Sequence, residues 1–192
     1  MSKTPVGKSA AQDLEWRIFA LEAERDCHEL LTLYGLYADF GLADEWVGIF
    51  TEDAVMEFNY FDDSAYLDEK LNPLVDDPTT VGWPEKFGRF VGHEELYEAA
   101  TEPRHKRLVG RCQHQTGGQP SVFRLLDDET ALIISDAIIY SRAVGNYAPE
   151  VAYQNHSLNR WVFRRVDGRW RISENIRKVM GSDGGRELLA GI

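Results

Sequence analysis

Long strands that follow one another without an intervening helix are the feature that most restricts how this sequence can fold. Strand-like segments cover residues 108–126, 130–143, 151–166 and 169–180. The stretches LDDET and VDGR, which lie between neighbouring segments, supply the Asp and Gly that tight connections between antiparallel strands require. We therefore predict that the C-terminal half of the chain forms one curved antiparallel sheet.

The first half of the chain has a mostly helical pattern. Residues 11–40 contain no Pro and a single Gly, and apolar side chains recur there at steps of three and four residues, which predicts a long amphipathic helix that Gly41 would end. These side chains are Leu14, Ile18, Leu21, Cys27, Leu30, Leu31, Tyr34 and Tyr37. Shorter helices are predicted at 43–50 and 92–100, with a strand at 54–60. Helices that precede a block of strands indicate an α+β fold, in which the sheet wraps a helix layer.

We expect a single domain at 12–180, between a flexible N-terminal tail at 1–11 and a C-terminal tail at 181–192. Residues 60–88 interrupt this domain with three prolines, seven acidic side chains and two lysines. The segment is too long to be a simple connector. Two interpretations stay open: a solvated acidic insertion, or a lid over a cavity.

The charge and hydropathy of the chain restrict its partners. A formal net charge of −11, from 21 Lys and Arg against 32 Asp and Glu, would repel a phosphate backbone. We therefore expect no nucleic acid and no membrane as a partner, and a ligand that is small and neutral or hydrophobic. There is no run of about 18 apolar residues and no apolar core of a signal peptide near the N-terminus. We expect a cytoplasmic protein in which Cys27 and Cys112 remain thiols.

Alternation along the segment 151–166 divides its side chains between two faces. One face carries Tyr153, Asn155, Ser157, Asn159, Trp161 and Phe163. This face is aromatic at both ends and polar but uncharged in the middle, which suits the wall of a small-molecule cavity. The other face, with Leu158, Arg160, Val162 and Arg164, points outward or toward a partner, so we expect a homo-oligomer.

Two polar residues outside this strand are candidates for catalysis. His114 lies in the stretch CQHQTGG on a predicted strand, where a structural role explains a lone histidine equally well. Asp39 falls near the C-terminal end of the first helix, where the helix dipole disfavours a carboxylate, so either a solvated helix end or a function must account for it. If the curved sheet brings His114 over this helix end, Asp39 would fix the imidazole tautomer and make it a base for a carbon-bound proton. Donors for charge that develops on a substrate carbonyl could be Ser157, Asn159, Tyr34 or Tyr140.

Other common kinds of site have no support in the sequence. The five histidines form neither an HxH nor an HExxH pattern, and no GxSxG, P-loop or GxGxxG motif is present. The basic run at 104–107 is explained by a solvated loop or by a site for an anionic substrate tail. We therefore expect no metal site and no cofactor.

Four stretches together resemble a known family. They are LYGLYADFGLADEWVGIFTEDAVMEF, a G-x-E-E-L helix that starts at Gly92, CQHQTGG and NHSLNRWVFRRVDGRWRIS. Over residues 12–180, apart from 60–88, the chain resembles the SnoaL-like branch of the nuclear transport factor 2-like superfamily, which includes ketosteroid isomerase, and within it the scytalone dehydratases. The resemblance implies a cone-shaped α+β barrel, in which a strongly curved antiparallel sheet and the N-terminal helices surround a deep pocket.

The resemblance also implies roles for single residues. Asp39 and His114 match the family's catalytic pair, and Ser157 and Asn159 match its substrate-binding Ser-x-Asn. The resemblance further implies a homodimer or homotrimer.

Three positions depart from the scytalone dehydratase pattern. The tyrosine expected directly before the aspartate is Ala38, a second pocket tyrosine falls at Phe58, and a second histidine falls near Tyr140. The resemblance therefore implies the proton-transfer chemistry of the family rather than action on scytalone itself. Side chains expected to bind the substrate are Tyr34, Tyr37, Phe58, Tyr140, Ser157, Asn159 and Trp161.

The sequence leaves two functions open. The first is a cofactor-independent, dehydratase-like lyase or isomerase that acts on a small hydrophobic carbonyl compound, cyclic or aromatic, with His114 as acid and base and Asp39 orienting it. The second is a noncatalytic small-molecule-binding or structural subunit, because DEWVGIFTEDAVMEF and RRVDGRWRIS also resemble the small β subunit of aromatic-ring hydroxylating dioxygenases. We favour the enzyme, since a structural subunit does not need a buried acid–base pair.

Overall fold

The helices and strands follow the predicted order, with most helices before the long strands. The computed structural model describes residues 10–59, 88–110, 112–115, 121–142 and 151–190. The helices are α1 (Ala10–Phe40), α2 (Ala43–Gly48), α3 (Gly92–Thr101), α4 (Pro103–Leu108) and α5 (Asp183–Leu188). The strands are β1 (Phe50–Asn59), β2 (Arg89–Val91), β3 (Cys112–Gln115), β4 (Ser121–Leu125), β5 (Thr130–Arg142), β6 (Val151–Val166) and β7 (Arg169–Val179).

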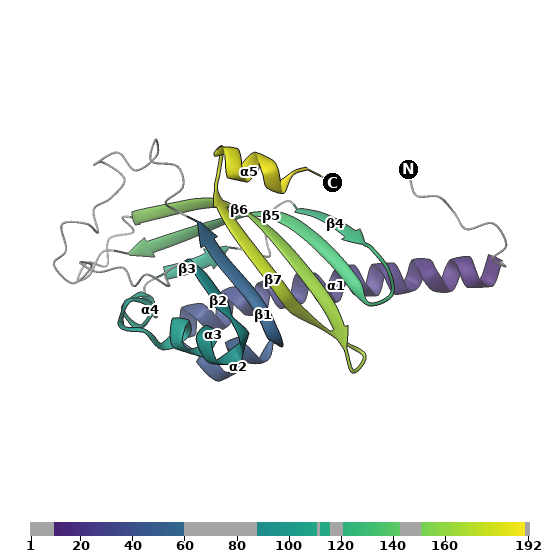
Figure 1. Ribbon diagram of the computed structural model, residues 1–192, viewed down its shortest axis with the longest axis horizontal. Coiled ribbons are helices and arrows are strands. Elements are labelled where there is room, and N and C mark those ends of the chain that lie inside the picture. The colour runs from purple at the N-terminus through teal and green to yellow at the C-terminus, as the bar shows by residue number, and fades with distance from the viewer. Residues whose placement is uncertain (1–9, 60–87, 111, 116–120, 143–150, 191–192) are drawn as a thin grey trace.

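The strands of this part of the chain form one strongly curled sheet, which α1 crosses on one side (Figure 1). Their order is β2-β1-β7-β6-β5-β3, and β4 also pairs with β5. The pairs are antiparallel except for β1 and β7, which run parallel and join the first strand of the chain to the last. The predicted fold class, a curved sheet packed on N-terminal helices, is confirmed, and the parallel pair makes the sheet a mixed one.

The buried face of α1 lies in its C-terminal two thirds. Cys27, Leu31 and Tyr34 are buried there and belong to the core, together with side chains of β1, β5, β6 and β7. In contrast, Leu14, Ile18 and Leu21 are among the exposed large apolar side chains. The apolar side chains therefore do not form one stripe along the whole helix. Those of its N-terminal part face away from the sheet, and those of its C-terminal part face toward it.

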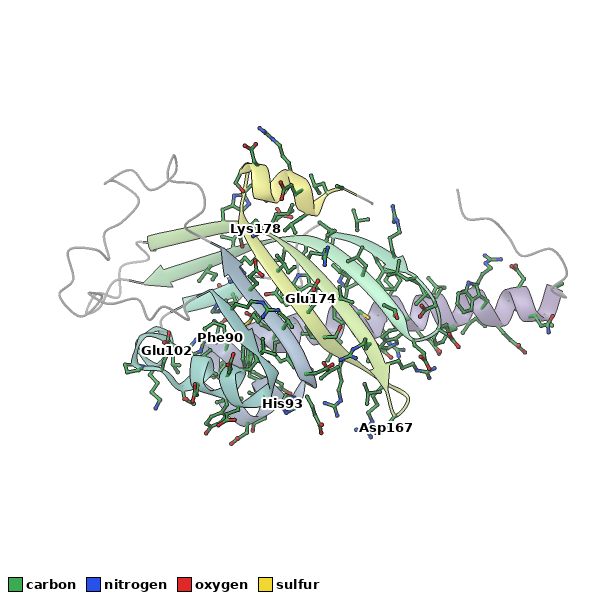
Figure 2. All side chains as sticks on the ribbon, viewed as in Figure 1. Phe90, His93, Glu102, Asp167, Glu174 and Lys178 are labelled. Carbon is green, nitrogen blue, oxygen red and sulfur yellow. The ribbon has the colours of Figure 1, made fainter. Side chains whose placement is uncertain are left out.

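The hairpin between β6 and β7 determines which side chains of β7 face inward. Asp167 and Gly168 both have positive φ, 51° and 75°, as a two-residue turn of the predicted Asp-Gly type requires, and Asp167 lies at the tip of this hairpin (Figure 2). Further along, Phe163 pairs with Ile172 whereas Val162 pairs with Glu174. One extra residue in β7 therefore forms a bulge, which shifts the inward-facing positions of the strand by one residue.

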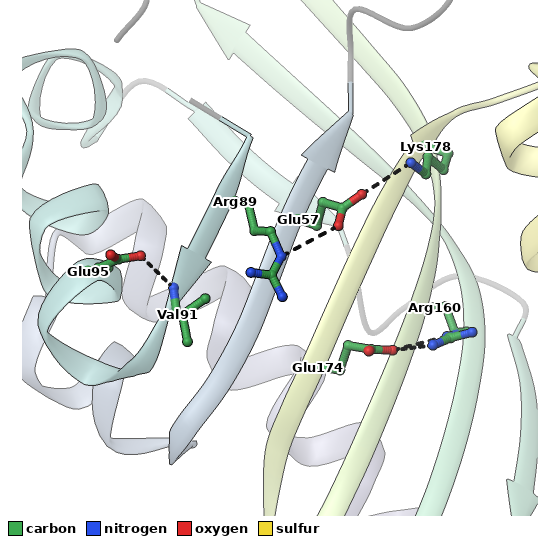
Figure 3. A network of polar contacts seen from close by, with 7 residues as sticks. All are labelled: Glu57, Arg89, Val91, Glu95, Arg160, Glu174 and Lys178. Atoms are coloured by element: carbon green, nitrogen blue, oxygen red, sulfur yellow. Dashed lines mark hydrogen bonds and ion pairs between the residues drawn. The ribbon is translucent and has the colours of Figure 1, made fainter. Parts of the chain in front are cut away.

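Ion pairs lie on the outer face of β2, β1, β7 and β6 (Figure 3). Glu57 of β1 accepts from Lys178 of β7 at 3.3 Å and lies 4.0 Å from Arg89 of β2. Arg160 of β6 donates to Glu174 of β7 at 2.5 Å. These pairs link four neighbouring strands, and the side of β6 that alternation predicts to point outward does so.

Several local predictions differ from the structure. The expected loop around the basic run is helix α4, because Pro103 at its first position favours a helix start. The single strand expected at 108–126 is described as two short strands, β3 and β4. Residues 183–188, expected in a tail, form α5, which packs on β6 and β7 and is capped by Ser182. Residues 60–87 lie outside the described part of the chain.

A pair of leucines on opposite sides of α1 tests this packing. Leu31 is fully buried and Leu36 is 47% exposed. We expect Leu31→Ala to lower the free energy of unfolding by about 2–5 kcal/mol, because it leaves a cavity in the core. The matched Leu36→Ala should change it by less than about 0.5 kcal/mol. Urea denaturation of both variants measures the difference, and equal losses would contradict the assigned orientation of α1.

Candidate active site

The last turn of α1 positions Asp39. Gly41, with φ of 68°, ends the helix, and its N–H donates to the carbonyl of Ala38 at 3.2 Å. The carbonyl of Asp39 accepts from the N–H of Gly110 at 2.9 Å, and the ring Nε2 of His105 lies 3.2 Å from the carbonyl of Ala38. Carbonyls at a helix end need partners from outside the helix. Here these partners tie the end of α1 to α4 and to the segment that leads into β3.

The side chain of Asp39 contacts His114 of β3 in two ways. The backbone N–H of His114 donates to Oδ2 of Asp39 at 2.9 Å, and the ring Nδ1 of His114 lies 2.5 Å from Oδ1. The two side chains are only 11% and 8% exposed. Because carboxylate oxygens accept, this contact places the imidazole proton on Nδ1 and makes Nε2 the basic nitrogen of the ring. The structure therefore brings together the two residues that the sequence singled out.

Tyr34 connects this pair to the aromatic core. Its ring lies edge-on to His114, with centroids 6.4 Å apart, and edge-on to Trp161 at 5.1 Å. It also packs against Trp46 and Phe50. The Tyr34 hydroxyl therefore has a fixed position one helical turn and a half before Asp39, on the buried side of α1.

Three predicted residues of β6 lie on its buried face. Ser157, Asn159 and Trp161 are all at most 1% exposed. The Nδ2 of Asn159 donates to Oγ of Ser157 at 3.3 Å, and Nε1 of Trp161 donates to Ser135 on β5 at 3.1 Å. Polar side chains therefore occupy the middle of the inner face, as the alternation of β6 predicts.

Two polar residues of β7 at the same place are missing from the sequence prediction. Arg177, 2% exposed, donates from Nε to Oδ1 of Asn159 at 2.9 Å and from Nη2 to the hydroxyl of Tyr34 at 3.4 Å. Asn175 donates from Nδ2 to the same Oδ1 of Asn159 at 3.3 Å. Strict alternation from Ile172 would put Glu174 inside instead. The bulge turns Glu174 outward and Asn175 and Arg177 inward. The sequence itself does not show where such a bulge occurs.

The hydrogen bonds around Asn159 fix the orientation of its amide. Arg177 and Asn175 both donate to its oxygen, so its Nδ2 group faces Ser157. Arg177 in turn reaches Tyr34, which packs against His114. A polar network therefore runs through the interior from Tyr34 through Arg177 and Asn159 to Ser157, and the Tyr34 ring at one end of it packs against His114.

His105 is a further ionisable group beside this pair, and the sequence prediction missed it. Burial, followed by the charge of His114, lowers its pKa. Its ring contact with the Ala38 carbonyl holds it against the last turn of α1. The signal in the sequence was present, since His105 lies inside the basic run, but the run was interpreted as a loop.

The remaining predicted residues do not join the pair in the described structure. Tyr37 is half-buried and packs against the core. Tyr140 pairs in register with Gln113, whereas Ile139 pairs with His114. Phe58 pairs in register with Arg177. The side chains of Phe58 and Tyr140 lie outside the described part.

The described residues offer no other kind of site beside this pair. Within the described ranges, no three His, Cys, Asp or Glu side chains gather in a way that could hold a metal ion. Cys27 is a buried free thiol whose pKa is raised by burial. No helix in the described ranges is long and apolar enough to cross a membrane.

The chain is similar in sequence to one protein family and in fold to several solved structures. Residues 20–175 match the family model of the SnoaL-like domain. No curated protein matches the chain. Among solved structures, a nuclear transport factor 2-like protein with a cystatin-like fold from Novosphingobium aromaticivorans is 23% identical, with a TM-score of 0.69 over 95% of this chain and 99% of that chain.

Two solved structures that carry the names of enzymes have the same fold. A candidate scytalone dehydratase from Novosphingobium aromaticivorans is 11% identical, with a TM-score of 0.58 over 85% of this chain and 88% of that chain. Hexachlorocyclohexane dehydrochlorinase LinA-type3 from Novosphingobium barchaimii is 12% identical, with a TM-score of 0.58 over 85% and 90%. At these identities the likeness concerns the fold alone.

The orientation of Asn159 can be tested by stability. Asn159→Ala removes the acceptor that Arg177 and Asn175 share, and leaving buried donors unpaired should lower the free energy of unfolding by about 1–3 kcal/mol. Asn159→Asp keeps an oxygen at the same place and should cost less. Urea denaturation measures both variants, and an equal loss in the two would show that Arg177 does not depend on this acceptor.

The lowered pKa of His105 predicts a pH dependence of stability. The unfolded chain binds a proton at His105 more readily than the folded protein does, so stability is full above the unfolded-state pKa of about 6.5 and falls as the pH drops below it. We expect His105→Asn to remove the part of the acid-induced loss of stability that His105 causes.

Denaturation curves between neutral and mildly acidic pH check this expectation. The unsubstituted protein, measured over the same pH range, is the control. A His105→Asn profile that equals the control profile would contradict it.

Proposed function

Because the chain belongs to the SnoaL-like family, we propose that it is a lyase or isomerase that moves a proton at carbon. The proposed substrate is a small hydrophobic carbonyl compound, cyclic or aromatic. The observation that carries the proposal is the 2.5 Å contact between Nδ1 of His114 and the carboxylate of Asp39 in a nearly buried place. A carboxylate that accepts from Nδ1 holds the ring in one tautomer and stabilises the imidazolium, which is what a histidine general base needs.

The proposed reaction begins at Nε2 of His114. This nitrogen takes a proton from the carbon next to the substrate carbonyl, and the electron pair of the broken C–H bond moves toward the carbonyl oxygen. Asp39 stabilises the resulting imidazolium through Nδ1. In a lyase, the carbonyl then re-forms, the electron pair makes a C=C bond, and the C–O bond to the β-hydroxyl breaks as His114 gives its proton to that oxygen, which departs as water. In an isomerase, His114 returns the proton to a different carbon.

The polar network of β6 and β7 suits the oxygen on which negative charge develops. The amide Nδ2 of Asn159 is a donor whose orientation Arg177 and Asn175 fix, so no reorientation is needed during the reaction. The hydroxyl groups of Ser157 and Tyr34 lie in the same network and are the other proposed donors. Arg177 adds positive charge behind this group of donors.

The similar structures agree with elimination as the reaction class. Dehydratase and dehydrochlorinase are names for enzymes that remove water and hydrogen chloride. Both reactions start with loss of a carbon-bound proton, as the proposed step does. The proposed chemistry uses protein side chains throughout, without a metal or organic cofactor.

Proton exchange at carbon tests the proposal. Tetralone, cyclohexanone and a β-hydroxy cyclohexanone are incubated with the protein in deuterium oxide, and proton NMR follows both deuterium incorporation next to the carbonyl and loss of the hydroxyl. We expect His114→Ala and Asp39→Asn each to lower the rate on an accepted probe by about 10²–10⁴, because one acid–base group is lost or misoriented.

His28→Ala is the matched control, because His28 also lies on α1, about three helical turns before Asp39, and its ring contacts Ser121 of β4 rather than Asp39 or His114. It should keep the full rate. A His114→Ala variant with undiminished turnover would contradict the assignment of the base. No exchange with any probe, together with a stoichiometric iron–sulfur subunit on purification from the native host, would instead support the structural-subunit function.

A further inference from the structure

The N-terminal part of α1 projects beyond the sheet as a helical arm, which we define as residues 10–22 (Figure 1). Every residue from 10 to 18 is exposed. Three large apolar side chains of the arm are among the most accessible in the described chain: Leu14 at 54%, Ile18 at 47% and Leu21 at 67%. Apolar side chains at this density on a solvated helix indicate a partner that covers them.

The apolar side chains of the arm form a single narrow seam. Ala11, Leu14, Ile18 and Leu21 follow one another at steps of three, four and three residues. This is the spacing of the two core positions in a coiled coil, whereas a helix that packs on a sheet has a wider apolar stripe. The seam therefore fits another helix with the same spacing.

The opposite side of the arm is already anchored to its own domain. Phe19 packs against Trp16 and Trp170, with centroids 5.6 and 6.5 Å away, and the guanidinium of Arg165 lies 5.2 Å from the Phe19 ring. At 100° per residue, Trp16 and Phe19 lie on the far side of the helix from Leu14, Ile18 and Leu21. The seam therefore faces away from the domain on a helix that is already formed, so pairing does not require the helix to fold first.

The charges beside the seam select a parallel arrangement. Arg17 and Glu22 flank it on opposite sides, at the positions that face each other between two parallel helices in register. Each Arg17 would then meet Glu22 of the partner subunit. An antiparallel arrangement would instead bring Arg17 to Arg17 of the partner subunit and Glu15 to Glu15 of the partner subunit. Opposite charges therefore meet in one arrangement and like charges in the other.

From these observations we propose that the arm is a self-association surface, on which the arms of two copies of this chain pair in parallel through Leu14, Ile18 and Leu21. The three acidic side chains of the arm, Asp13, Glu15 and Glu22, outnumber its one arginine, which disfavours an anionic membrane as the occupant. The proposal is independent of the proposed catalytic function. It differs from association through the outer face of the sheet, where ion pairs link β1, β7 and β6.

Disulfide trapping tests the arrangement directly. In parallel helices in register, the two copies of Leu21 face each other across the seam. We expect Leu21→Cys to form a covalent dimer on air oxidation. Asp13→Cys, an exposed site away from the seam, and the unsubstituted chain with its native cysteines are the matched controls and should not. Leu21→Cys that crosslinks no faster than Asp13→Cys would overturn the parallel pairing.

Mass measurement by light scattering tests the seam and its charges. Replacing Leu14, Ile18 and Leu21 together by Ser should lower the mass to that of a smaller species, with unchanged circular dichroism because the three residues are exposed. Arg17→Glu should weaken association about tenfold, and the double variant Arg17→Glu with Glu22→Arg should restore it. An unsubstituted chain that is monomeric at every concentration, or a triple variant of unchanged mass, would overturn the proposal.

Discussion

The contact between the Asp39 carboxylate and His114 joins the two halves of the fold. Asp39 belongs to the last turn of α1 and His114 to β3, so their contact ties the helix layer to one edge of the sheet. The carboxylate accepts hydrogen bonds from two N–H groups of His114. These bonds fix the backbone of His114 and the rotation of its ring. Because the pair is nearly buried, each side chain compensates part of the desolvation of the other. Stability and the proposed chemistry therefore depend on the same contact.

A second constraint comes from the hairpin between β6 and β7. The Asp167-Gly168 turn sets the register, and the bulge after Ile172 then turns Asn175 and Arg177 inward. Without the bulge, Glu174 would face the interior instead of pairing with Arg160 outside. One inserted residue thus supplies the interior with a guanidinium and an amide that orient Asn159. Bulges of this kind commonly re-aim side chains next to functional sites.

The sequence predicts those features of the structure that depend on one segment of the chain, and it does not predict those that depend on contacts between segments. The long helix, the Asp-Gly turn and the inward side of β6 follow from spacing within one segment, and they are found as predicted. The side of α1 that Leu14, Ile18 and Leu21 occupy could not be predicted, because spacing shows that a helix has an apolar stripe but not which partner covers it. Asn175 and Arg177 were missed since a bulge depends on pairing between strands. His105 was missed because α4 is a short helix held in place by its neighbours.

In the proposed function, Asp39 holds His114 with its proton on Nδ1, so that Nε2 acts as the base. Nitrogen-15 NMR of labelled protein observes both ring nitrogens of His114 separately and tests this claim most directly. The account predicts that neutral His114 carries its proton on Nδ1, and that Asp39→Ala abolishes this preference. A neutral His114 with its proton on Nε2 and an unprotonated Nδ1 facing Asp39 would contradict the account.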